Sequence, residues 1–199
     1  MELFLDTTGS YLNIALSHEG VILENIHECA LRSQSELIIP RLQELLTKHS
    51  MTVDHIDSIV ITKGPGSYTG VRIAMTVAKV LCTMKEIPLY TLSTLQAMSL
   101  GAKGKVCVMM DARSKRAFTG FYENGVALQA DSIMELEVLK EKVEKEGYAV
   151  VGDAHLIEME AIPTDMNSAV FNYTPLWQRV DNVHALVPEY LKDQESYGK

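Results

Sequence analysis

The stretch "TKGPGSYTGVRIAMTVAKVL", residues 62–81, joins an apolar run to a helix-like run through three glycines, Gly64, Gly66 and Gly70. The preceding run, 56–62, has the pattern of a buried strand, and residues from about 70 to 84 have the spacing of a helix. A strand that leads through glycines into a helix is typical of α/β folds, and it is also the shape of a phosphate-binding loop. We therefore expect an α/β protein and test the loop as a nucleotide site.

Spacing excludes two nucleotide motifs at this loop. A P-loop has four residues between its first glycine and a Gly-Lys pair, whereas five residues separate Gly64 from Gly70 and no lysine follows. A dinucleotide fingerprint fits Gly64 and Gly66 but has Thr69 at its third glycine position. Two interpretations stay open: a tight crossover in which the glycines supply positive φ, or an anion site with Ser67 and Thr69 at a helix N-terminus.

Hydrophobic periodicity predicts two halves with a similar order of elements. The first half reads as three strands, a helix in "SQSELIIPRLQELLTKHS", the strand and helix around the glycines, another strand and a short helix. The second reads as three strands, a helix over 131–147 and a strand. Each half opens with a strand that ends in an aspartate, Asp6 or Asp111. We expect boundaries at 1–102, 103–182 and 183–199, the last a terminal helix and tail.

Composition narrows the classes of function. The chain has 199 residues and a formal charge of −8, which makes it a poor stand-alone binder of nucleic acid. Its densest group of cations reads as a solvated surface or as a local basic patch: Lys103, Lys105, Arg113, Lys115 and Arg116.

The sequence shows no pattern of a metal site, disulfide framework or membrane span. Cys29, Cys82 and Cys107 are widely spaced without a CxxC pair, and no histidines stand four residues apart on an expected helix. No run approaches the roughly 20 apolar residues of a membrane span, and "MELFLDTTGS" lacks a signal peptide's basic region. We expect a protein of the reducing cytoplasm.

The helix after the glycines carries small residues every four positions, Gly70, Ala74, Ala78 and Cys82. Such a stripe lets another backbone approach closely. A second apolar arc lies on another face: Ile73, Val77, Val80 and Met84. Either the helix packs tightly on its own sheet, or it is sandwiched between its own core and a partner.

Six segments occur in this order along the chain: "LFLDTTGSYLNIAL", "SQSELIIPRLQELL", "GPGSYTGVRIAMTVAKVL", "STLQAM", "MDARSKRAFTGFY" and "VPEYL". Together they resemble the bacterial TsaB (YeaZ) family, over residues 1–122 and again over 184–191. The resemblance implies an α/β fold of two actin-like ATPase-type half-domains (ASKHA, ribonuclease H-like), the second of them reduced.

The resemblance also implies a non-catalytic scaffold. Family members pair with the paralogue TsaD, which holds the metal and forms threonylcarbamoyladenosine beside the tRNA anticodon, together with the ATPase TsaE. The segment "SQSELIIPRL" lacks the histidine pair of the catalytic relative, and Asp111 precedes Ala112 where kinases of this fold have glycine. We expect no catalytic residue, no metal, no cofactor bound by the chain alone, tRNA contact only through the complex, and a homodimer in isolation. ATP at the complex interface stays open.

The expected sites follow from this resemblance. The first group is expected to bind the partner: Ser35, Ile38, Arg41, Leu42, Leu45, Gly70, Val71, Ala74, Met75, Ala78 and Cys82. The second is a candidate vestigial anion or nucleotide site: Asp6, Thr8, Gly64, Gly66, Ser67 and Thr69. Two alternatives to the scaffold are a stand-alone ATPase or phosphotransferase of the same fold and a glycoprotease-like peptidase.

Overall fold

The computed structural model describes residues 1–191. The chain forms two compact units, which we describe separately: Met1–Ser93 with Asn167–Pro188, and Thr94–Met166, which the chain rejoins at Glu189. The chain therefore passes from the first unit to the second between Ser93 and Thr94, before the expected boundary at 102/103. The reason is that Leu95, in α3 (Thr94–Ser99), is buried against strand residues of the second unit.

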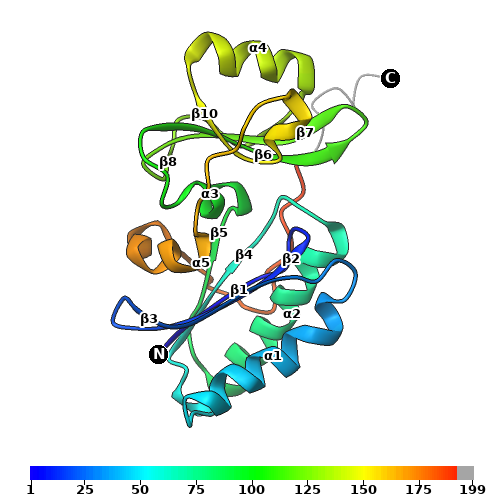
Figure 1. Cartoon of the computed structure of the whole chain (residues 1–199). Coiled ribbons are helices and arrows are strands. Elements are labelled where there is room, and N and C mark those ends of the chain that lie inside the picture. The colour runs from blue at the N-terminus through cyan, green and yellow to red at the C-terminus, as the bar shows by residue number, and fades with distance from the viewer. Residues whose placement is uncertain (192–199) are drawn as a thin grey trace. The chain divides into compact units, whose positions relative to one another are not determined.

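The first unit is built on a six-stranded mixed sheet (Figure 1). β1 pairs antiparallel with β2 and parallel with β4, so the long N-terminal hairpins flank a parallel centre. The strand order is β11 (Gln178–Arg179), β5 (Leu89–Leu92), β4 (Ser58–Thr62), β1 (Glu2–Asp6), β2 (Tyr11–His18) and β3 (Val21–Cys29).

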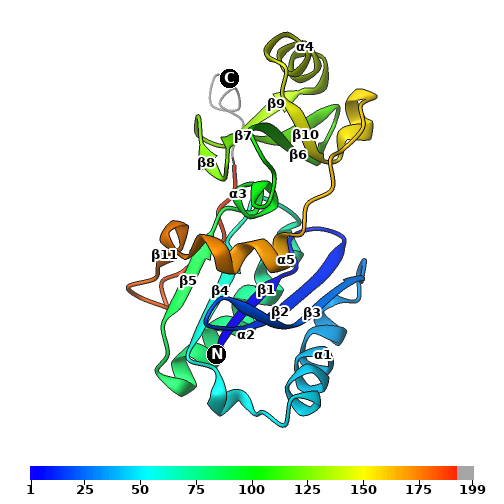
Figure 2. The same ribbon diagram turned by 60° about the vertical axis from the view of Figure 1, so that its left-hand side comes forward.

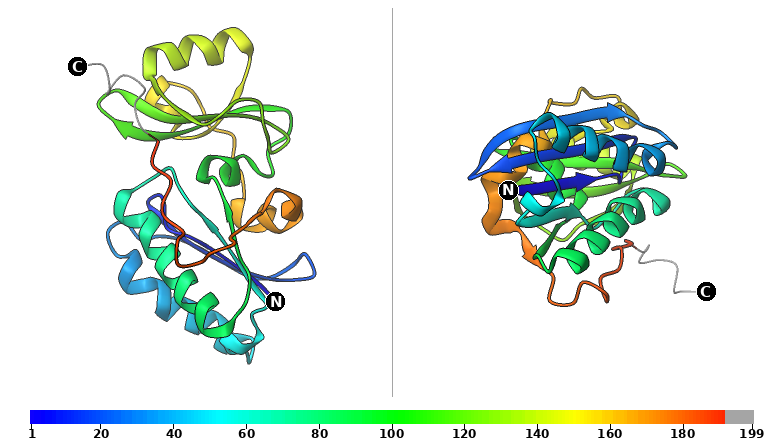
Figure 3. Two further views of the ribbon diagram at one scale, coloured as in Figure 1. Left: turned by 180° about the vertical axis from the view of Figure 1, so that it is seen from behind. Right: turned by 90° about the horizontal axis from the view of Figure 1, so that it is seen from below.

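Two neighbouring helices, α1 (Gln34–Lys48) and α2 (Tyr68–Lys85), cover one face of this sheet (Figure 3). Alternate strand residues such as Leu3 and Leu5 meet the buried sides of both helices in one core. The opposite face carries α5 (Met166–Ala169) and η3 (Val170–Leu176) (Figure 2). A short 3-10 turn, η1 (Val53–His55), precedes β4.

The second unit has a smaller sheet (Figure 1). Its strands are β10 (Ala149–Gly152), β6 (Lys105–Arg113), β7 (Arg116–Glu123) and β8 (Val126–Ala127) in spatial order, with β9 (Ser132–Glu135) also on β7. Helix α4 (Leu136–Glu146) packs on one face through Leu139 and Val143. Helix α3 packs on the other face, and η2 (Ala154–Ile157) follows β10.

Two local expectations are corrected, and one alternative that the sequence left open is decided. The helix expected over 131–147 begins at Leu136, because 132–135 pair with β7. Residues 183–191 contain no helix; they form a turn and then an extended strap, while the rest of the expected tail lies outside the described residues. The five basic residues make no single patch, because Lys105 and Arg113 stand at opposite ends of β6, roughly 25 Å apart.

In the described part of the chain, no helix has the length and apolar content needed to cross a bilayer.

Candidate functional site

The glycine loop follows β4 and opens α2, with Ser67 as the N-cap residue whose hydroxyl accepts from Gly70 N. A Cβ on Gly66 would lie 2.6 Å from Thr8 O, and one on Gly70 would lie 2.1 Å from Thr7 O. These are contacts with backbone, which cannot move aside as a flexible side chain can. The glycines thus let the β1–β2 turn touch the start of α2, as in the crossover interpretation.

Asp6 at the end of β1 is the centre of a buried polar network. Its Oδ1 accepts from Thr8 N at 3.1 Å, Thr8 Oγ1 at 2.6 Å and Thr62 Oγ1 at 2.5 Å, and its Oδ2 accepts from Asn13 Nδ2 at 2.8 Å. Only 3% of Asp6 is exposed. Both carboxylate oxygens are therefore engaged by donors of this chain, and the carboxylate acts as the organiser of the turn.

The network reaches the surface through a histidine. Asn13 Nδ2 donates to Asp6, so its Oδ1 faces His27 Nδ1 at 2.6 Å, and that nitrogen must carry the proton. The exposed His27 ring stacks on Tyr11 with centroids 4.3 Å apart. No pattern in the sequence indicated this link. The alternation within each strand assigns Asn13 to one face of β2 and His27 to one face of β3. Only the pairing register of β2 with β3 shows that the two residues lie opposite each other.

The candidate anion-site residues are partly brought together. Thr8 O accepts from Ser67 N at 2.8 Å, which places the turn of Asp6 and Thr8 against Gly66 and Ser67. Gly64 is buried in the same loop, and the exposed Thr69 lies in the first turn of α2. Within residues 1–191 no three potential metal ligands cluster. Binding of an anion here stays a prediction.

Most of the expected partner-binding residues lie in the unit's own core, which corrects the surface assigned to them. Nine are buried: Ile38, Leu42, Leu45, Gly70, Val71, Ala74, Met75, Ala78 and Cys82. Ser35 is exposed, and Arg41 is half-buried. The stripe of small residues therefore brings α2 close to its own sheet, the alternative that the sequence left open.

Other side chains form the outer surface of these helices. On α2 the arc is Ile73, Val77, Val80 and Met84, of which Ile73 and Val77 are partly buried against the core, and on α1 it is Ile39; we together call these residues the outer apolar surface. Val80 is 51% exposed, Met84 74% and Ile39 52%. Because large exposed apolar side chains on two neighbouring helices gather at binding surfaces, this surface is the candidate interface.

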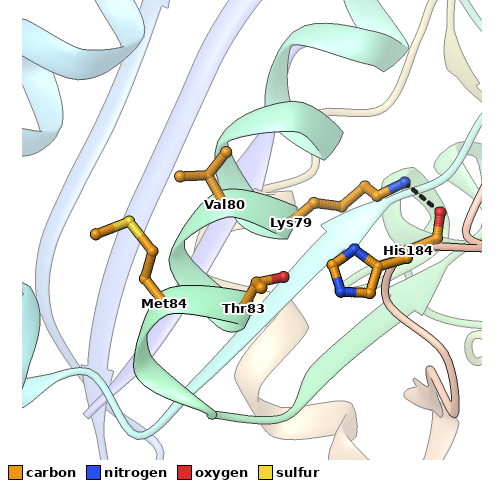
Figure 4. Close-up of a pocket in the computed structure, with 5 residues that line it drawn as sticks. All are labelled: Lys79, Val80, Thr83, Met84 and His184. Carbon is orange, nitrogen blue, oxygen red and sulfur yellow. Dashed lines mark hydrogen bonds between the residues drawn. The ribbon is translucent and has the colours of Figure 1, made fainter.

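A groove borders this surface where the strap of residues 183–188 runs beside α2 (Figure 4). Lys79 Nζ donates to His184 O at 2.9 Å and to Leu186 O at 3.0 Å, which fixes the strap. The groove encloses about 310 Å³ and is lined by Lys79, Val80, Thr83, Met84 and His184.

Charged contacts fix the other side of α1. Arg41 Nε lies 3.0 Å from Glu28 Oε1, and Lys48 Nζ lies 2.6 Å from Glu24 Oε2 on β3. Hydrogen bonds from Lys48 and then His49 hold the pKa of Glu24 below its ordinary value. Arg41, expected to bind a partner, is thus engaged within the unit.

The cysteines offer no activated nucleophile among the buried positions. Burial raises the pKa of the Cys82 thiol to about 12, and burial likewise raises the pKa of Cys107 to about 12. A reactive thiol has the opposite shift. Cys29 is exposed.

Comparison with known proteins places these features in one family. The family model described as TsaD, tRNA N6-adenosine threonylcarbamoyltransferase, matches residues 20–171. The chain is 29% identical to the tRNA threonylcarbamoyladenosine biosynthesis protein TsaB of Bacillus subtilis, over 99% of this chain and 96% of the relative. It is 29% identical to TsaB of Escherichia coli, over 72% of this chain and 66% of the relative.

A solved structure matches the fold. YeaZ from Pseudomonas aeruginosa superposes with a TM-score of 0.78 at 21% identity, over 96% of this chain and 99% of that chain. The expected α/β fold class is thus confirmed: the chain has a mixed α/β fold with two sheets, which it shares with YeaZ.

Proposed function

The chain belongs to the TsaD family, within its TsaB (YeaZ) branch, and on this premise we propose that it is the non-catalytic scaffold subunit for threonylcarbamoyladenosine formation in tRNA. It binds a TsaD-type threonylcarbamoyltransferase, with a TsaE-type ATPase as a further member of the complex. It meets tRNA only within that complex, and forms a homodimer when alone.

The observation that carries the partner-binding part is the outer apolar surface. Val80 and Met84 expose half or more of their area on a helix whose inner side is already buried. Burying such side chains in an interface removes apolar area from water, a favourable contribution of about 25 cal/mol per Å² that has to outweigh the entropy cost of association. The proposal therefore moves the contact from Ala74 and Ala78 to the outer arc of the same helix.

The non-catalytic part is supported by Asp6. The strand-end aspartate of a phosphotransferase of this fold needs oxygens free for a metal–phosphate group. Here both oxygens of Asp6 accept from Thr8, Thr62 and Asn13. We propose that the chain alone binds no cofactor, and that ATP, where it takes part, binds at the complex interface.

Co-purification with the TsaD-type enzyme of the same organism tests the partner surface. The double variant Val80→Glu, Met84→Glu is expected to raise the Kd at least tenfold, about 1.4 kcal/mol, because two charges would be buried without partners. The matched control is Val138→Glu, since Val138 is 52% exposed on α4 against 51% for Val80 on α2. Unchanged binding by the double variant, or an equal loss by the control, contradicts the proposed surface.

A phosphate-release assay on the isolated chain distinguishes the scaffold from a stand-alone ATPase. If the isolated chain hydrolyses ATP and Asp6→Ala abolishes that turnover, the scaffold proposal is wrong and the chain is an enzyme by itself. No turnover above the buffer rate, with activity appearing only in the complex, is the expected result. The peptidase alternative has no metal cluster to support it in residues 1–191.

A further inference from the structure

We infer that Thr7 is a positioning residue for the partner-binding helix, and that the buried turn of residues 6–8 sets the affinity of the outer apolar surface for its partner. The inference rests on the proposed function, because it concerns the same surface. It assigns a role to a turn that, from its sequence, suggested an anion site.

The first observation is a two-sided hydrogen bond from Thr7 to one turn of α2. Thr7 Oγ1 donates to Gly70 O at 2.6 Å and accepts from Ala74 N at 3.0 Å. Thr7 is fully buried, with 0% of its surface exposed. A buried hydroxyl that bonds both the carbonyl and the amide of one helical turn fixes that turn's distance from β1 and its rotation about the helix axis.

The second observation is the closeness of the backbones at the same place. The Cβ position of Gly70 lies 2.1 Å from Thr7 O, so the turn touches the helix where any other residue would force them apart. One residue on, Thr8 O accepts from Ser67 N at 2.8 Å. The first turns of α2 thus meet the turn through backbone and through a side chain together.

The consequence for the partner lies in the side chains of α2 that flank this contact. Gly70 and Ala74 are buried on the inward side, and Ile73 and Val77 of the same turns are partly buried at its edge, with Val77 one turn before the exposed Val80. Because a helix is rigid, a shift of its inner contact moves the outer side chains with it. Interface side chains held by packing must stay within about 0.5 Å of their productive position. Thr7 therefore acts on the partner through α2 without touching it.

The network offers a matched control for the loss of one buried hydroxyl. Thr62 is also 0% exposed, and its Oγ1 donates to Asp6 Oδ1 at 2.5 Å, rather than to α2. Thr7→Val and Thr62→Val each remove one hydroxyl and keep the side-chain shape. Only the first removes a contact with the partner-binding helix.

The experiment measures two quantities on the full chain. Hydrogen exchange of the isolated chain is expected to accelerate over residues 68–76 in Thr7→Val and to stay at the wild-type rate there in Thr62→Val. Titration with the TsaD-type enzyme is expected to give a Kd at least fivefold higher for Thr7→Val, within twofold of wild type for Thr62→Val, and restored by Thr7→Ser.

Each outcome decides a different claim. If the wild-type chain does not bind the TsaD-type enzyme, the proposed function fails. If it binds and Thr7→Val binds equally well, or Thr62→Val loses as much affinity, only the positioning role of Thr7 is overturned. Should Thr7→Val not fold, Gly70→Ala takes its place, since its Cβ must displace Thr7 O. Unchanged exchange and affinity in that variant overturn the inference as well.

Discussion

The buried carboxylate of Asp6 gives the sharpest test of the fold's energetics. Replacing it in Asp6→Ala removes the acceptor of four hydrogen bonds, from Thr8 N, Thr8 Oγ1, Thr62 Oγ1 and Asn13 Nδ2. The backbone amide of Thr8 and the amide group of Asn13 are held in place and lose their acceptor. The two hydroxyls can rotate toward other oxygens.

The magnitude follows from these donors. Each buried donor left without an acceptor costs about 1–3 kcal/mol, so the two fixed donors together cost about 4 kcal/mol. That is a large share of the roughly 5–15 kcal/mol by which a domain is stable. The second unit supplies the control, because Asp111, which was expected to end a strand, lies two residues before the end of β6 and is exposed. Asp111→Ala is expected to cost less than about 1 kcal/mol.

Urea unfolding followed by tryptophan fluorescence measures this loss. The chain has one tryptophan, Trp177, whose ring lies 5.5 Å from Tyr90 and 6.1 Å from Phe171 between centroids. It belongs to the same unit as Asp6, so its emission reports the unfolding of that unit. A loss below about 1 kcal/mol for Asp6→Ala would refute the reasoning, because the donors would then have other acceptors.

The conservative variant Asp6→Asn tests which group donates and which accepts in the hydrogen bonds that connect Asp6, Asn13 and His27. Its carboxamide keeps one acceptor and turns a nitrogen donor toward Asn13 Nδ2, so Asn13 must flip its amide. His27 then faces a donor and has to move its proton from Nδ1 to Nε2. ¹⁵N chemical shifts of the His27 ring detect this exchange of tautomers. Unchanged shifts would show that the Asn13 amide is oriented by something other than Asp6.

Two further predictions concern titrating groups. At pH 8 iodoacetamide is expected to label Cys29 alone in the folded chain and all three cysteines in urea, because burial raises the pKa of Cys82 and Cys107 to about 12. Mass spectrometry of the intact chain counts the labels. Labelling of a buried thiol in the folded chain contradicts the prediction. Lys48 and His49 lower the folded-state pKa of Glu24. Its contribution to stability is therefore present above the unfolded-state pKa and is lost as pH falls through the folded-state pKa. Glu24→Gln is expected to be less stable than wild type by up to about 1 kcal/mol at neutral pH. In acid, where Glu24 is protonated in the wild type, the two free energies of unfolding should be equal. Urea unfolding at both pH values measures the difference.

Local pattern predicted most elements of this chain and missed those whose partners are distant. The strand before the glycines and the helix after them were expected at 56–62 and about 70–84, and they form as Ser58–Thr62 and Tyr68–Lys85. Residues 132–135 have an apolar pattern that also suits a helix start. They form a strand because β7 offers them a free edge. That edge is a property of the folded sheet, and no neighbouring residue signals it.

The polar network around Asp6 was likewise predictable from the sequence only in part. That Asp6 ends a strand was readable from the apolar run that precedes it in β1, and the glycine spacing excluded two nucleotide motifs. That Thr62 donates to Asp6 from 56 positions away was not readable, because a parallel pairing of β1 with β4 brings them together.

The residue order alone predicts that α2 has two apolar arcs, one of small residues and one of large ones, since both follow from a period of 3.6. It did not determine which arc meets the sheet. The fold settles this, because at Gly70 the backbone of the β1–β2 turn comes so close that no side chain fits there. Ala74 and Ala78 are therefore inside, and Val80 and Met84 are left on the surface, where we propose that the partner binds.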